Sequence, residues 1–364
     1  CLLAIPLARA LARRRFPGRG LLIRLLAAPF LLPVVVAVLG ILAVFGRMGP
    51  VNQGLAALGL PPMSIFGLHG VVLAHVFLNL PLVARMLLQG WQAIPAERFR
   101  LAQSLGMPPS AQFRHLEGPM LRAQLPGAFA TVFLLCLTSF AVALTLGGGP
   151  RASTVELAIY QALRFEFDLG RAALLAAVQF ALCAAVTLVG LRLTQAAGFG
   201  AGLGRISAIP APAGWRQGVD SAVIVLATLF LLAPLTAVIW RGVPGLFALP
   251  SGVIEALGRS VLIAVASAVL SIFAALTLAL AVARGVKWLE LAAMLPLAAS
   301  GLVMGTGLFL LVHPVARPES LALPVTLLVN ATMALPFLFR LLLPETRALL
   351  ADYGRLSDSL GLSG

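Results

Sequence analysis

Long apolar segments, separated by short polar or basic stretches, recur along this chain of 364 residues. They cover residues 25–46, 66–88, 124–146, 171–193, 219–240, 260–283, 290–312 and 321–343. Each holds about 20 residues, which in a helix rising roughly 1.5 Å per residue crosses the roughly 30 Å hydrocarbon core of a bilayer. The chain is therefore predicted to be an all-α, polytopic membrane protein with about eight complete transmembrane helices.

The composition agrees with a membrane location. Hydrophobic residues make up 60% of the chain and charged residues 10%, and the mean hydropathy is +1.03. A soluble core of this length could not hide so much apolar surface. The formal net charge of +14 could indicate a nucleic-acid binder, but the basic residues lie between the apolar segments and not in one patch. They are better explained as cytoplasmic loop anchors, so no nucleic-acid partner is expected.

A short polar segment at residues 94–106 recurs at residues 349–361. Adding 255 to a position in the first copy gives the matching position in the second. The residues identical at this offset include seven that mark the repeat: Pro81, Arg85, Arg100, Leu101, Ser104, Leu105 and Gly106 match Pro336, Arg340, Arg355, Leu356, Ser359, Leu360 and Gly361. At the position that matches Glu97 the second copy has another acidic residue, Asp352. The chain is therefore interpreted as an internal duplication.

The first copy is typical of a short amphipathic helix at residues 95–106. Pro95 suits the first turn, where its missing N–H has no role, and the helix dipole there favours the anion of Glu97. Leu101 and Leu105 form a narrow apolar ridge, and Gly106 supplies a left-handed stop. We expect this helix to fit a groove on a partner protein. The alternative, a helix lying on lipid, usually has a longer apolar face.

The placement of Lys and Arg predicts the orientation. With the opening loop in the cytoplasm, most of the 26 basic residues, including those of both copies, fall on the cytoplasmic side. An even number of spans separates the copies, so the halves are expected to be parallel, related by an axis along the membrane normal. We assign residues 1–195 to the first half, 196–218 to a cytoplasmic linker and 219–364 to the second half. Each half is expected to be truncated at its outer end.

The region around the first copy resembles a known loop. Arg100-Leu101-Ala102, three residues, Gly106, nine residues and Leu116-Glu117-Gly118-Pro119 are similar to the EAA loop of type I ABC importer permeases. That loop has Glu-Ala-Ala at the first triplet and Leu-Pro at the end, so the chain departs from the pattern in both places. Because such departures are usual in permeases that fuse both halves in one chain, the chain is identified as resembling that group.

This resemblance implies that two cytoplasmic ATPase subunits, which carry the ATP and Mg²⁺, hold the two loops. The residues of the first contact would be Glu97, Arg100, Leu101, Ala102, Ser104, Leu105, Gly106 and Pro119, and those of the second Asp352, Arg355, Leu356, Ser359, Leu360 and Gly361. No catalytic residue, metal or cofactor is expected in this chain. Its glycine run, residues 147–149, is followed by Pro150 and lacks the Lys-Ser or Lys-Thr of a phosphate loop, and its histidines have no metal-ligand spacing.

Residues 146–173 resemble thiamine and thiamine pyrophosphate permeases more than the iron(III) permeases of the same group. The resemblance implies ATP-driven import of thiamine or its pyrophosphate across the bacterial inner membrane, from a periplasmic binding protein, by alternating access. Iron(III) is the alternative substrate. On its residues alone this segment is an external loop, in which Ser153 and Glu156 form a capping box that opens a short helix. That helix either lies near the receptor docking face or is a plain connector.

Polar and helix-breaking residues inside the spans have two interpretations each. Pro81 and Pro336 each permit a kink, either as a hinge of the gate or as a static feature of packing. His75, Asn79 and Asn330 either line the substrate pathway or form hydrogen bonds between helices. An ion-driven transporter would need an ionisable residue deep in a span, and only His75 stands out. A membrane enzyme would need convergent acids or histidines, which the sequence lacks.

Overall fold

The computed structural model describes residues 1–26, 29, 32–149, 153–193, 214–247, 249–312 and 321–359. Within these residues every regular element is a helix, which confirms the predicted all-α fold. The chain forms two compact units, Cys1–Thr154 with Leu188–Ala248 and Val155–Thr187 with Leu249–Gly364. These units follow contacts in space, whereas the predicted halves follow the repeat and stay a prediction. Most of the predicted linker lies outside the described residues.

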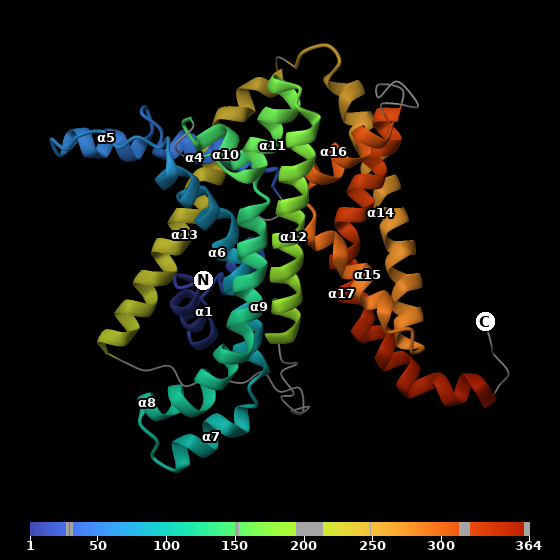
Figure 1. The fold of residues 1–364 in the computed structure, drawn as a ribbon. Coiled ribbons are helices and arrows are strands. Elements are labelled where there is room, and N and C mark those ends of the chain that lie inside the picture. Colours follow the sequence, from blue (N-terminus) through green and yellow to red (C-terminus); the bar gives the residue numbers. More distant parts are fainter. Residues whose placement is uncertain are drawn as a thin grey trace. The chain divides into compact units, whose positions relative to one another are not determined.

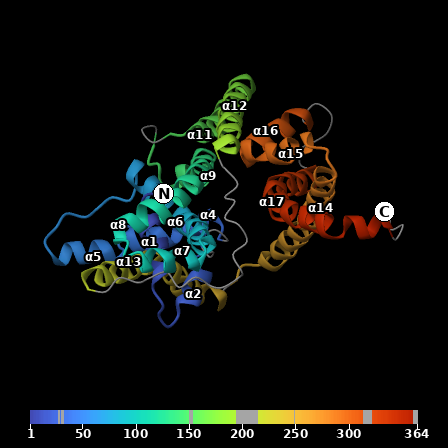
Figure 2. The same cartoon turned by 90° about the horizontal axis from the view of Figure 1, so that it is seen from below.

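The first unit is built around a long helix, α6 (Leu68–Ala93), which packs against α1 (Ala4–Arg13) and α9 (Gly118–Leu137). Helix α13 (Trp215–Gly242) packs against α1 and against α4 (Val34–Phe45) (Figures 1 and 2). Its other α-helices, among the described residues, include α2 (Arg19–Leu25), α5 (Pro50–Ala57), α7 (Ala96–Ser104), α8 (Pro109–Gln112) and α10 (Phe140–Leu146). The core is apolar and includes the fully buried side chains of Leu7, Leu11, Phe77, Leu87 and Trp91.

The second unit is organised by the packing of α14 (Val253–Ala283) along α17 (Ala322–Ser359). The hydroxyls of Ser267 and Ser271, one turn apart, donate to the carbonyls of Leu327 and Ala331 at 3.2 and 3.1 Å. Small residues of this kind let two membrane helices approach closely. The unit also contains α11 (Val155–Gln161), α15 (Trp288–Met294), α16 (Gly301–Val312) and most of α12 (Leu169–Leu193).

Seven helical stretches in the described residues are long and apolar enough to cross a membrane. They are Val34–Ala57, Leu68–Ala93, Pro109–Leu137, Leu169–Gly190, Trp215–Gly245, Val253–Ala283 and Ala322–Arg347. The predicted span at 290–312 instead forms two short helices, α15 and α16, joined by a 3₁₀ turn that contains Pro296. Proline lacks the N–H that would continue the helical hydrogen bonds. The Ser300 hydroxyl accepts the Val303 N–H at 3.0 Å and so caps the start of a new helix, α16.

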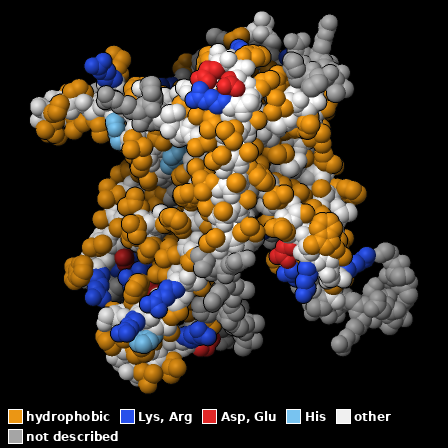
Figure 3. All heavy atoms as spheres, viewed as in Figure 1, with side chains coloured by type: hydrophobic (Ala, Val, Ile, Leu, Met, Phe, Trp, Pro, Cys, Tyr) orange, Lys and Arg blue, Asp and Glu red, His pale blue; other side chains and the backbone are white. Residues whose placement is uncertain are grey.

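Charged side chains are concentrated at the ends of the long helices. In Figure 3 basic side chains gather around α7 and α8, at one end of the first unit, while the surface of its long helices is mostly apolar. The exposed arginines of that end are Arg98, Arg100, Arg114 and Arg122. This distribution agrees with a cytoplasmic location of the first loop.

Candidate coupling site

Helix α7 begins where α6 stops, because the backbone leaves helical geometry at two residues. Ile94 is extended, and Pro95, at φ −57° and ψ 135°, is the N-cap of α7. Glu97 lies in the first turn of α7. The predicted short helix at residues 95–106 is thus confirmed as a separate element, Ala96–Ser104.

The end of α7 is fixed by Gly106. Its φ of +63° is left-handed, as predicted, and nothing lies within 4 Å of a Cβ built there. The N–H of Gly106 bonds to the carbonyl of Gln103, and the N–H of Met107 to the carbonyl of Ala102, both at 2.9 Å. These bonds satisfy carbonyls that the ended helix leaves free. Glycine is therefore required here by the backbone and not by space.

The two faces of α7 have different surroundings. Ala96, Phe99 and Ala102 are buried, and Phe99 is only 2% exposed. Leu101 and Leu105 are 61% and 68% exposed, so the predicted apolar ridge faces away from the unit's core. Glu97, Arg100, Ser104 and Gly106 are also exposed. The helix is thus anchored to its own unit by one face, while the other is open to a partner.

A buried carboxylate ties the far end of the loop to the core. Glu117, at 0% exposure, closes the π-helical turn Phe113–Glu117 that follows α8. Its oxygens accept from Arg9 Nε at 2.7 Å, Arg13 Nη2 at 2.7 Å and Trp91 Nε1 at 3.2 Å. The Arg9 guanidinium also lies over the ring of Phe113. We call Glu117, Arg9, Arg13 and Trp91 the Glu117 cluster.

The Glu117 cluster joins both ends of the loop to α1. Trp91 lies at the end of α6, just before α7, and Glu117 lies just before α9, while both arginines come from α1. A second ion pair, Arg14 Nε to Asp220 Oδ2 at 2.8 Å, ties α1 to α13. The loop is therefore held to α1 at both of its ends.

Sequence reasoning missed the Glu117 cluster, although the sequence carries a signal for it. Glu117 is an acid at the border of a long apolar segment, where an unpaired charge is costly. Arg9 and Arg13 are four residues apart and so share one face of a helix. Together they indicate a buried ion pair. Pro119, predicted as a contact residue, is exposed on the first turn of α9.

The second copy of the loop has a different backbone. Helix α17 continues without a break through Asp352, Arg355 and Leu356 to Ser359, so residues 349–359 are not a separate helix. The physical reason is the residue at the first copy's break, since Leu350 stands where the first copy has Pro95. Leu360 and Gly361 lie outside the described residues. The role of this segment as a second contact stays a prediction.

The predicted hinges and pathway residues are placed but not brought together. Pro81 lies buried inside α6 and Pro336 inside α17, and both helices continue through them. Asn79 donates to the His75 carbonyl at 2.9 Å and to Cys136 Sγ of α9 at 3.7 Å, an interhelical contact of the kind that the second interpretation requires. Asn330 is exposed in the second unit. Hinge and pathway roles stay predictions.

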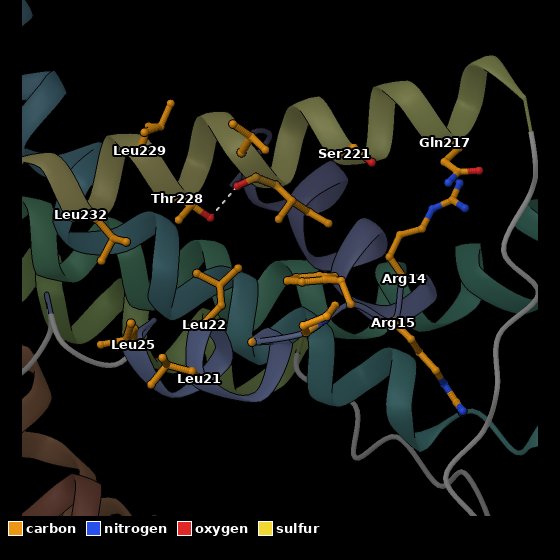
Figure 4. A pocket seen from close by; sticks show the side chains of 15 residues that line it. Arg14, Arg15, Leu21, Leu22, Leu25, Gln217, Ser221, Thr228, Leu229 and Leu232 are labelled. Atoms are coloured by element: carbon orange, nitrogen blue, oxygen red, sulfur yellow. Dashed lines mark hydrogen bonds between the residues drawn. The ribbon is translucent and has the colours of Figure 1, made fainter.

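A groove of about 540 Å³ runs between α2 and α13 in the first unit. Figure 4 shows Arg14, Arg15 and Gln217 toward one end and leucines 21, 22, 25, 229 and 232 along the rest. Among the described residues, none of those predicted for the two loops or the substrate pathway lines it. The exposed face of α7 is therefore separate from this groove.

Comparison with known proteins identifies relatives along nearly the whole chain. No family model matches the chain, and no solved structure matches it. The thiamine transport system permease protein ThiP of Salmonella typhimurium is 43% identical over 99% of this chain and 70% of its own length. ThiP of Escherichia coli has the same identity and coverage. ThiP of Brucella abortus is 39% identical over 100% of this chain and 69% of its own length.

Proposed function

Because this chain belongs to the family of thiamine transport system permease proteins, we propose that it imports thiamine or thiamine pyrophosphate as the membrane subunit of an ATP-driven transporter. Its place is the bacterial inner membrane, in line with its seven helices of membrane-spanning length. The names of the relatives favour thiamine over iron(III) as the substrate. The nearly complete coverage of this chain supports the assignment for both halves.

The ATP chemistry belongs to two partner subunits in this proposal. The observation that carries it is the surface of α7, where Leu101 and Leu105 are exposed on a helix held by its opposite face. A narrow apolar ridge flanked by Arg100 and Glu97 suits a groove on a partner better than lipid, since a lipid-bound helix usually has a broad apolar face. Each ATPase subunit would hold one loop, the second being the end of α17.

The transport cycle follows from this attachment. A periplasmic binding protein delivers the substrate at the outer face of the permease. ATP then draws the two ATPase subunits together and moves the loops that they hold, and the permease switches its substrate cavity from one side of the membrane to the other. Hydrolysis resets the ATPase subunits. The Glu117 cluster passes the movement of α7 to α1, α6 and α9, since it fixes the loop at both ends.

The double variant Leu101→Ala/Leu105→Ala in the full-length permease tests this attachment. Both side chains are exposed, so the amount of permease in the membrane should not change. Burial of a leucine contributes about 1.5 kcal/mol or more, and uptake should therefore fall at least about 10-fold, with ATPase activity no longer stimulated by substrate-loaded binding protein. The matched control is Leu58→Ala, which removes a leucine 75% exposed at the end of α5. Normal coupled uptake by the double variant would refute the proposal.

A further inference from the structure

A fully buried acid of the second unit takes no part in the coupling site. Glu156, in the first turn of α11, is 0% exposed. The Gln179 side-chain amide, on α12, donates from Nε2 to Glu156 Oε1 at 2.8 Å and is itself 1% exposed. Helix α11 also packs against α16, which begins directly after Ser300. The carboxyl thus bonds to α12 from a helix that also contacts α16.

Two oxygens of this group have no hydrogen-bond partner. They are Glu156 Oε2 and Gln179 Oε1, and both are buried acceptors. Among the ion pairs of the described residues, none involves Glu156. An ionised carboxylate in this place would be a buried charge without a counter-ion, next to a second oxygen that also lacks a donor. Both conditions are strongly unfavourable.

Protonation of Glu156 would remove both the unpaired charge and the shortage of a hydrogen-bond donor. If Oε2 is protonated, its O–H can donate to Gln179 Oε1, while Gln179 Nε2 already donates to Oε1 of the same carboxyl. The acid and the amide then exchange two hydrogen bonds in a ring. We propose that Glu156 is a proton-binding site, held as a neutral carboxylic acid in a pair with Gln179, and that this pair fastens α11 to α12.

The electrostatic surroundings agree with a neutral acid. Burial raises the pKa of Glu156, and the polar side chains of Ser300 and Gln179 only partly offset this. Helix α16 carries no titratable residue, and α11 carries only Tyr160 besides Glu156. On α12, Arg171 is ion-paired with the exposed Glu166, and Cys183, one turn beyond Gln179, is buried. These groups supply no buried cation that would hold Glu156 ionised.

The competing role for Glu156 is that of a counter-ion for a cationic substrate such as thiamine. A counter-ion must be ionised and reachable by the substrate, whereas Glu156 is fully buried, at 0% exposure. The two roles predict opposite results for Glu156→Gln. In a structural pair the new amide replaces the O–H donor with an N–H donor, while a counter-ion would lose its charge.

The experiment uses the full-length permease with its ATPase in lipid vesicles. Glu156→Gln should keep thiamine uptake and the unfolding temperature close to those of the wild type, and so should the exchange variant Glu156→Gln/Gln179→Glu. Glu156→Leu, which removes the pair, should lower uptake at least about 10-fold by leaving the Gln179 amide unsatisfied. The matched control is Glu166→Gln, which neutralises an exposed glutamate of the same unit.

Infrared spectroscopy tests the proton without a transport assay. The wild type should show the C=O stretching band of a protonated carboxyl at neutral pH, and Glu156→Gln should lose it. Absence of that band would overturn the proposal, as would loss of uptake in a correctly assembled Glu156→Gln variant. Because the band and the unfolding temperature do not depend on the substrate, failure of this proposal is distinguishable from failure of the proposed function.

Discussion

The two copies of the repeated loop, residues 94–106 and 349–361, share six residues at a fixed spacing and yet differ in backbone structure. In the first copy α6 ends, the chain turns at Ile94 and Pro95, and α7 begins as a separate helix. In the second copy α17 runs through the matching positions to Ser359. The comparison teaches that the shared residues are compatible with both backbones. One position, which is Pro95 in the first copy and Leu350 in the second, decides whether the helix is interrupted.

The second copy changes direction by another means. Figure 1 shows that the last part of α17 turns aside from the rest of the helix. Pro344 lies inside α17, where the first copy has Gln89 at the matching position of α6. A proline inside a helix removes one hydrogen bond and permits a kink. In the first copy a break in the backbone separates the short helix from α6. In the second copy α17 contains a proline but is not broken.

The largest expected effect on stability comes from disrupting the Glu117 cluster, which only the first copy is shown to have. Glu117→Ala removes the carboxylate that pairs with Arg9 and Arg13 and leaves their guanidiniums partly buried without a partner. Breaking a buried ion pair costs about 3 to 5 kcal/mol of unfolding free energy. Thermal unfolding of the purified permease measures the loss. Glu97→Ala, which removes an exposed acid of α7, is the control, and equal effects of the two variants would contradict the anchor.

The next effect separates the two faces of α7. Phe99→Ala empties a buried site and should cost about 3 kcal/mol of unfolding free energy. Leu101→Ala, on the exposed face, should change stability by less than about 0.5 kcal/mol and lower coupled uptake instead. Unfolding and uptake assays on the same preparations check both. If Leu101→Ala were the more destabilising variant, the assignment of faces would be wrong.

A proline tests whether the second copy is continuous in the working transporter. Leu350→Pro places in α17 the residue that precedes α7 in the first copy. Proline inside a helix costs up to about 3 kcal/mol, and we expect about 2 kcal/mol here because the position is near the helix end. Denaturant unfolding measures the cost. A neutral or stabilising effect would show that the second copy is also broken at this point.

The smallest effect concerns the helix stop. Gly106→Ala places a side chain on a residue at φ +63° and should cost about 1 kcal/mol, since alanine is disfavoured in the left-handed region. Gly361→Ala should cost the same if the second copy stops in the same way. Unfolding of the two single variants gives the comparison. Unequal costs would confine the left-handed stop to the first copy.

Much of the fold follows from the sequence because it depends on local properties. The length of the apolar segments predicts the long helices. Pro95 and Gly106 fix the bounds of α7 through backbone geometry. The interruption at Pro296 is harder to predict, since apolar length alone reads 290–312 as one span. The Glu117 cluster depends on contacts between residues about 100 positions apart, which periodicity does not specify. Leu350 could have indicated the continuous α17, because the repeat itself points to the missing proline.

The central claim is that both cytoplasmic segments contact the ATPase subunits through matched leucines. It is tested most directly by placing a photo-crosslinking amino acid at position 101 or 356 of the full-length permease, assembled with its ATPase. The account predicts a covalent product with the ATPase subunit from each position, and none from position 58 on the exposed end of α5. Absence of the ATPase product at both 101 and 356, with the complex intact, would contradict it.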